Sequence, residues 1–366
     1  MEWSNIQEGQ VWAARHFLED EEAARICSGY PDAGAFLLDL RQHPRDQIRW
    51  RELALAAVRR WKDRGAEGRH LGNLGNAYRH LGEPRRAIEF YEQQLGISRE
   101  TGDRGDEGNA LGSLGLAYAA LGEPRRAIEL YEQQLVITRK IGDRRGEGNA
   151  LGSLGLAYAA LGEPRRAIEL YEQWLAITRE IGDRRGEGQA LGNLGDAYLT
   201  LSESCRAIEF YDQDLAIVRE IGDRRGESAV LGSLGLAYKN LGKPRRAIEL
   251  YEQQLTIARE IGDRRSEGQA LGNLGNAYVA LPGDFDRAIE LYEQQLTIAH
   301  EIGDRRSEAI ASWNLGFALE KGGDLVRAAA LKQFLVDYER EIDHPDAEKH
   351  AADVAALRAR IAEQKS

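Results

Sequence analysis

The chain has little of what usually anchors a protein in a membrane or crosslinks it outside the cell. Its 366 residues include two cysteines, and no stretch approaches the ~20 apolar residues of a membrane span. Cys27 and Cys205 lie far apart, so we expect two buried thiols rather than a disulfide. The polar residues 2–5 are followed by no apolar run, so we expect no signal peptide and a cytoplasmic location.

An excess of positive charge is also missing. The formal net charge is −11, from 49 basic and 60 acidic residues. This charge argues against nonspecific binding to nucleic acid or to anionic membranes, both of which require a basic face. Arg-Arg pairs do recur, as at Arg125-Arg126 and Arg144-Arg145, but we expect them to pair with acidic side chains at helix ends.

Motifs of catalysis are absent as well. The sequence contains no GxxxxGK[ST] phosphate loop and no HExxH pair, and His70 and His80 lie too far apart for a compact metal pair. Paired carboxylates are plentiful, but they recur throughout the chain, which favours a structural role. We therefore predict that the protein is not an enzyme and that it needs no cofactor and no metal.

What the chain does have is a repeat of forty residues. Residues 147–186 repeat residues 107–146 with three changes, and a ladder of leucines at intervals of 40 marks the period: Leu71, Leu111, Leu151, Leu191, Leu231 and Leu271. A period of this length predicts a solenoid in which each unit buries its apolar face against its neighbour. Such near-identity is typical of recent duplication or of a sequence partly derived from a consensus.

The period also divides the chain. We expect an N-terminal helical cap over 1–26, a degenerate leading repeat over 27–66, seven repeats over 67–342 and a C-terminal capping helix over 343–366. The sixth repeat carries one extra residue in the loop 282–285. In the last segment, Pro345 suits a first helical turn, and an apolar stripe follows it: Ala351, Val354, Leu357 and Ile361.

Each repeat encodes two helices. In the second repeat we expect them over about Arg104–Leu121 and Pro124–Ile141, since apolar residues recur at intervals of three and four. Gly122 suits a left-handed helix end, and Asp143 suits the cap of the next helix. Gly112 and Gly115 lie inside the first helix, where we expect them to allow close helix approach.

These residues resemble a known family. The pattern Leu111-x2-Leu114-Gly115-x2-Tyr118, followed by Ala127 and Tyr131, resembles the tetratricopeptide repeat, with leucine where the family often has tryptophan. The forty-residue length is closest to the long variant of Pins-type scaffolds, and it is similar to kinesin light chains and to arrays in bacterial signal-transduction ATPases. The resemblance implies an all-α fold, a right-handed superhelical solenoid of antiparallel helix pairs, and a bacterial origin is consistent with it.

The resemblance also implies where a partner binds, because in this family the first helix of each unit lines a concave groove. The positions that match carry amides, small residues and leucines. The candidate partner-binding residues are Arg69, Asn73, Asn76, Arg79, Asn109, Ser113, Leu116, Asn149, Ser153, Leu156, Gln189, Asn193, Asp196, Leu236, Lys239, Gln269, Asn273, Asn276, Asn314 and Phe317.

Two alternatives remain open within this set and beside it. The three leucines either face a partner or pack against the neighbouring helix. Trp174, which replaces Gln134 of the twin repeat, is either a packing substitution or a binding residue on the convex face.

Two functions are compatible with these observations. The first is a noncatalytic scaffold that binds a partner peptide or protein in its groove. The second is a regulatory or sensor subunit that controls a separate bacterial effector enzyme, such as a protease, nuclease or ATPase. Either function implies a protein partner, and the sequence leaves open whether the protein is a monomer or part of a hetero-complex.

Overall fold

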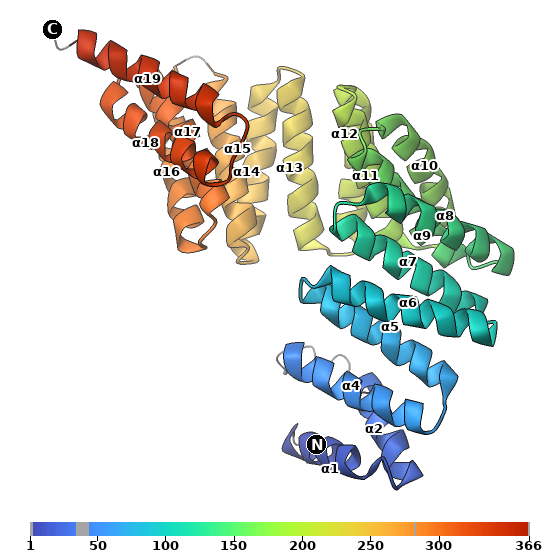
Figure 1. Cartoon of the computed structure of the whole chain (residues 1–366). Coiled ribbons are helices and arrows are strands. Elements are labelled where there is room, and N and C mark those ends of the chain that lie inside the picture. The colour runs from blue at the N-terminus through green and yellow to red at the C-terminus, as the bar shows by residue number, and fades with distance from the viewer. Residues whose placement is uncertain (1–2, 34–43, 282, 365–366) are drawn as a thin grey trace. The chain divides into compact units, whose positions relative to one another are not determined.

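The computed structural model describes residues 3–33, 44–281 and 283–364, and the predicted all-α class is confirmed over these ranges (Figure 1). They contain 18 helices and no strand. The first helices along the chain are α1 (Trp3–His16), α2 (Glu21–Ala33), α4 (Pro44–Arg60), α5 (Arg64–His80), α6 (Pro84–Thr101), α7 (Arg104–Ala120), α8 (Pro124–Ile141), α9 (Arg144–Ala160) and α10 (Pro164–Ile181). The remaining helices are α11 (Arg184–Thr200), α12 (Ser204–Glu220), α13 (Arg224–Asn240), α14 (Pro244–Glu260), α15 (Arg264–Val279), α16 (Phe285–Glu301), α17 (Arg305–Gly322), α18 (Leu325–Glu341) and α19 (Ala347–Glu363). None of these helices is long and apolar enough to cross a membrane.

The chain divides into two compact units, residues 1–183 and 184–366. In both units each helix packs against the next one along the chain, and α5 to α18 form seven consecutive pairs. We call the odd-numbered members, from α5 to α17, the first helices. Within each unit a first helix also contacts the first helix of the next pair, as α7 contacts α9 and α13 contacts α15. The first helices of each unit therefore form a continuous row.

The helix boundaries follow from local sequence. In the second repeat, α7 and α8 begin where the sequence predicts, and α7 ends one residue earlier than expected. Gly122 adopts a φ of 75°, a left-handed conformation that glycine takes without steric cost, and Pro124 opens α8. The Asp143 side chain caps α9 by accepting a hydrogen bond of 2.9 Å from the Gly146 N–H.

A glycine–tyrosine contact sets the distance between the two helices of a repeat. A methyl group added at Gly115 would overlap the ring of Tyr131, and one added at Gly112 would lie 2.8 Å from the Gln134 amide. The same tyrosine is almost fully buried in six repeats: Tyr91, Tyr131, Tyr171, Tyr211, Tyr251 and Tyr292. This confirms the expected role of the helix glycines, whose propensity cost of ~1 kcal/mol is offset by packing.

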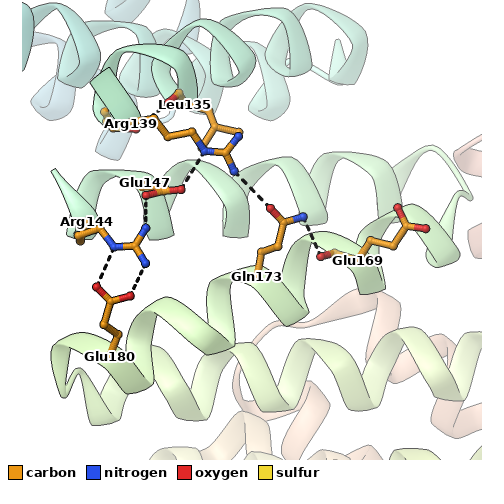
Figure 2. Close-up of polar contacts among 8 residues, drawn as sticks. Leu135, Arg139, Arg144, Glu147, Glu169, Gln173 and Glu180 are labelled. Carbon is orange, nitrogen blue, oxygen red and sulfur yellow. Dashed lines mark hydrogen bonds and ion pairs between the residues drawn. The ribbon is translucent and has the colours of Figure 1, made fainter. Parts of the chain in front are cut away.

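Ion pairs join consecutive repeats. In Figure 2, the buried carboxylate of Glu147 accepts hydrogen bonds from Arg139, 2.8 Å away on the preceding helix, and from Arg144 on its own helix. Arg144 also pairs with Glu180 on the following helix. The arrangement recurs along the array, for example at Glu67, Glu227 and Glu267. The prediction that such arginines pair with acidic residues at helix ends is confirmed for this set.

At Glu227 and Glu267 the ion pairs lower the pKa of the carboxyl group. Desolvation opposes the shift, but hydrogen bonds from two arginines hold the pKa of each carboxyl below its usual value. These glutamates are therefore charged when they bridge two repeats, and burial alone does not neutralise them.

The ends of the array differ from the expectation in detail. The expected boundary between residues 26 and 27 falls inside α2, and part of the expected leading repeat, 34–43, lies outside the described residues, as does Pro282 of the sixth-repeat loop. Pro345 precedes α19 instead of lying in its first turn, because the helix begins at Ala347. The predicted apolar stripe of α19 is present, with Val354 and Leu357 buried.

The two cysteines have different environments. Cys27 is buried as predicted, and desolvation raises the pKa of its thiol to about 11. The prediction for Cys205 was wrong, since its side chain is exposed in the first turn of α12.

Candidate partner-binding face

All twenty candidate residues lie on the first helices, from α5 to α17, and none of them is buried. In each repeat they alternate with buried positions such as Leu111 and Leu114, which face the paired helix. In each of the two units, we call this row of accessible side chains the first-helix face. Whether a partner binds there stays a prediction, but the face is accessible in every repeat.

Three leucines at one repeat position are exposed on this face. Leu116 is 45% exposed, Leu156 54% and Leu236 37%. About half of each side chain is therefore open to a partner, even where the rest packs against a neighbouring helix. Around Leu116 the small side chains of Ala119 and Ala120 are also exposed, which leaves room for a partner's side chain.

Polar residues occupy the same position in three other repeats. Asn76, Asp196 and Asn276 each accept a hydrogen bond from the buried tyrosine hydroxyl of their own repeat, at 2.8, 2.5 and 2.8 Å. In the two asparagines this bond occupies the amide oxygen, so the amide nitrogen remains as a donor. The position therefore offers either an apolar contact or a polar one, depending on the repeat.

Amide side chains gather at a pocket of about 310 Å³ between α15, α16 and α17. Four of the candidate residues line it: Gln269, Asn273, Asn276 and Asn314. Ile298 supplies an apolar wall, and the buried Oε1 of Gln295 has no hydrogen-bond donor among the described residues. This pocket combines an apolar surface with several groups able to bind a peptide backbone.

Trp174 lies inside the repeat instead of on an outer face. Its side chain is 8% exposed, and a methyl group added at Gly152 would lie 3.0 Å from its indole ring. The interpretation of Trp174 as a packing substitution is confirmed, because the indole fills the place that Gln134 takes in the twin repeat.

The repeat built from α11 and α12 departs from the others in charge. Asp214 stands where four other repeats have a glutamine, and its carboxylate lies over Gly188 and Gly192 of α11. Desolvation, together with the charges of Asp196 and Asp223, raises the pKa of Asp214 to about 7. Sequence reasoning missed Asp214 because the position belongs to the second helix, although comparing the repeats would have singled it out.

At the C-terminal end, the first-helix face is partly engaged by the chain itself. Glu320 of α17 pairs with Lys332 of α18 and with Arg360 of α19. Phe317 remains 38% exposed, with the ammonium groups of Lys321 and Lys332 over its ring. Within the described residues, no group of three or more histidine, cysteine, aspartate or glutamate side chains is arranged to hold a metal ion.

Several solved structures are similar to this chain. A signal transduction ATPase with numerous domains from Pyrococcus horikoshii, described as having a tetratricopeptide repeat sensor, is 18% identical with a TM-score of 0.68; the match covers 94% of this chain and 55% of that one. BtubC (BKLC) from P. vanneervenii is 21% identical with a TM-score of 0.56, over 60% of this chain and 93% of that one. These similarities concern the fold alone.

A putative kinesin light chain from Podosopora anserina with nearly identical TPR-like repeats is 27% identical over 52% of this chain and 95% of that one, with a TM-score of only 0.46. No curated protein sequence matches the chain.

The family itself is shown by the sequence. Profiles of the tetratricopeptide repeat match residues 66–140, 106–180, 148–220, 187–260 and 226–299, and a second profile of the same description matches 274–335. These overlapping matches span the paired helices α5 to α18 almost completely. The chain belongs to the tetratricopeptide repeat family, whose fold is a scaffold for protein–protein interaction.

Proposed function

We propose that the protein is a noncatalytic scaffold that binds a segment of a partner protein along its first-helix face. The observation that carries this proposal is the exposure of Leu116 and Leu156 at equivalent positions of neighbouring helices. An isolated exposed leucine is ordinary, but here two lie side by side in a row of small residues. An apolar side chain of a partner fits between them.

Burial of a leucine-sized side chain contributes roughly 1.5–3 kcal/mol. Accessible amides two turns before each leucine, Asn109 and Asn149, are placed to bond a partner's backbone. The acidic net charge of the chain favours a protein partner over nucleic acid.

The test uses a displayed library of random dodecapeptides. Peptides selected on the wild-type protein are measured against the double variant Leu116→Asp, Leu156→Asp, and we expect binding to weaken at least about tenfold, since ~1.4 kcal/mol suffices for that. Val136→Asp is the matched control, because Val136 is 66% exposed on the second helix α8. Circular dichroism checks that each variant is folded.

Three outcomes contradict the proposal: no peptide is enriched, binding by the folded double variant is unchanged, or the control loses as much affinity. If the double variant unfolds, the leucines belong to the core, and their exposure in the structure is contradicted.

The regulatory alternative uses the same face. It is suggested by the Pyrococcus horikoshii ATPase, whose tetratricopeptide repeats form a sensor. If the native partner proves to be an enzyme, the regulatory function requires that adding this protein changes the enzyme's turnover. A scaffold leaves that turnover unchanged.

A further inference from the structure

In the repeat formed by α11 and α12, one glycine of the first helix is more accessible than its equivalents in other repeats. Gly192 of α11 is half-buried, whereas the glycine at the same position of five other repeats is buried: Gly72, Gly112, Gly152, Gly232 and Gly272. In most of those repeats the longer glutamine side chain covers the glycine, as Gln254 covers Gly232. Asp214 is one methylene shorter, so the surface above Gly192 is left partly open. We call this space the Gly192 notch.

The Asp214 carboxylate forms one wall of the notch. Oδ1 lies 2.9 Å from the position of a methyl group at Gly188, and Oδ2 lies 2.9 Å from that of a methyl group at Gly192. Asp214 is 5% exposed, and no described residue donates a hydrogen bond to its side chain. A carboxylate so desolvated and without a donor is costly, and a cation within reach would stabilise its charged form.

The charged side chains that act on Asp214 are also negative. Asp196 lies one turn after Gly192 on α11, and its Oδ1 accepts a hydrogen bond from the Tyr211 hydroxyl. Asp223, the N-cap of α13, contributes a further negative charge, and the pKa of Asp214 is raised by both neighbours after desolvation. Arg184 and Arg224, at the starts of the adjoining first helices, are already paired with glutamates.

We propose that the Gly192 notch binds the ammonium group of a lysine side chain from the partner segment. The proposal rests on the proposed function, because the notch opens on the first-helix face beside Asn193. An ammonium is a compact point charge with three donors, which matches the Asp214 carboxylate over Gly192, with Asp196 one turn away, better than a planar guanidinium does. Leu199, one turn beyond Asp196 on the same face of α11, is placed to contact the methylene stem.

A divalent metal is the less favoured occupant. In the described part of the chain, no third acidic, histidine or cysteine side chain joins Asp196 and Asp214 in a group that would hold a metal ion. A lysine, by contrast, needs only one or two carboxylates and brings its own hydrophobic stem.

The first experiment uses the dodecapeptide selection. On the wild-type protein we expect a lysine to recur at one position of the enriched peptides. Replacing that lysine by norleucine should weaken binding at least about tenfold on the wild-type protein, and much less on Asp214→Gln. The variant restores the residue found at Gln94, Gln134, Gln254 and Gln295, so the fold should be kept. Asp212→Asn, which removes the same charge from an exposed site of α12, is the control.

The second experiment needs no peptide. Protein labelled with ¹³C at aspartate carboxyl carbons is titrated with n-butylammonium, and the Asp214 signal is assigned by its loss in Asp214→Gln. We expect a saturable shift and a fall in the pKa of Asp214, with no such response to tetramethylammonium or to Ca²⁺.

The outcomes separate the two proposals. If no peptide is enriched but butylammonium shifts the Asp214 signal, the scaffold proposal fails and the notch remains. If peptides bind through the leucines without a preferred lysine and butylammonium has no effect, the notch proposal alone is overturned. A response to Ca²⁺ in place of butylammonium overturns it in favour of a metal site.

Discussion

At the scale of single residues, glycine has opposite effects at two helix positions. Gly115 faces the Tyr131 ring, whereas Gly96 in α6 is exposed with no atom within 4 Å of an added methyl group. We predict that Gly115→Ala lowers the free energy of unfolding by roughly 1–3 kcal/mol through overpacking. Gly96→Ala should instead raise it by about 0.5–1 kcal/mol, because alanine is the better helix former. Thermal unfolding measures both, and a Gly115→Ala protein as stable as wild type would refute the close contact.

The charge of Asp214 predicts a dependence of stability on pH. Its pKa is near 4 in an unfolded chain and about 7 when folded, so ionisation destabilises the fold increasingly from pH 4 to pH 7 and by a constant amount above. The acidic groups acting on it are Asp196 of α11 and Asp223 at the start of α13.

We therefore predict that Asp214→Gln stabilises the protein by roughly 1–2 kcal/mol at pH 8 and by little at pH 4.5. Melting temperatures of the variant and of the Asp212→Asn control, taken at both pH values, check this. An equal gain at both pH values would contradict a raised pKa in the folded protein.

At the scale of helices, one repeat lacks an ion pair between its two helices that the other repeats have, and we call this ion pair the joint of a repeat. Arg144, Arg184 and Arg224 each pair with a glutamate on the following second helix. Arg104 pairs with Glu107 on its own helix, but the residue of α8 that corresponds to Glu180 is Lys140, another cation.

Lys140→Glu should complete this joint and raise the melting temperature by up to about 2 °C, a small gain because the pair is exposed. In a protein that also carries Arg104→Ala, the same substitution should give no gain. A gain of equal size in both backgrounds would assign the effect to net charge instead of to the pair.

The last helix covers the apolar end of the array. Leu357 of α19 belongs to one buried cluster with Leu315 and Leu319 of α17 and Leu325 of α18. Leu357→Ala should cost roughly 2–4 kcal/mol and speed hydrogen exchange first in α17 and α18. Arg358→Ala, at the exposed neighbouring position, should leave exchange unchanged, and equal exchange in the two variants would show that α19 is no cap. Deletion of residues 343–366 should act in the same direction and lower solubility.

At the scale of the whole chain, the fold was predictable because each repeat marks its own helix ends. Gly122 and Pro124 stop one helix and start the next, and the leucine ladder fixes the register of every unit. The candidate face was predictable only as a set of positions. The exposure of Leu116 depends on the distance between neighbouring helices, and the desolvation of Asp214 depends on a glycine 22 positions earlier in the sequence; neither is encoded locally. The burial of Cys205 was predicted wrongly, because the residue type alone does not indicate which side of a helix a cysteine occupies.

The uniform chemistry of the joints has a consequence for how such a chain changes over generations. Arg264 pairs with Glu301 across 37 residues, where the other joints span 36, because the additional residue of the sixth repeat lies in a loop. This ion pair therefore forms with either loop length, but it requires that the two helices keep their register. Loss or duplication of residues 147–186 would keep every paired arginine opposite a matching glutamate. An insertion or deletion of a few residues inside a helix would shift the register and break these ion pairs. The length of this protein can therefore change by recombination in steps of one whole repeat, and each step adds or removes one segment of the first-helix face.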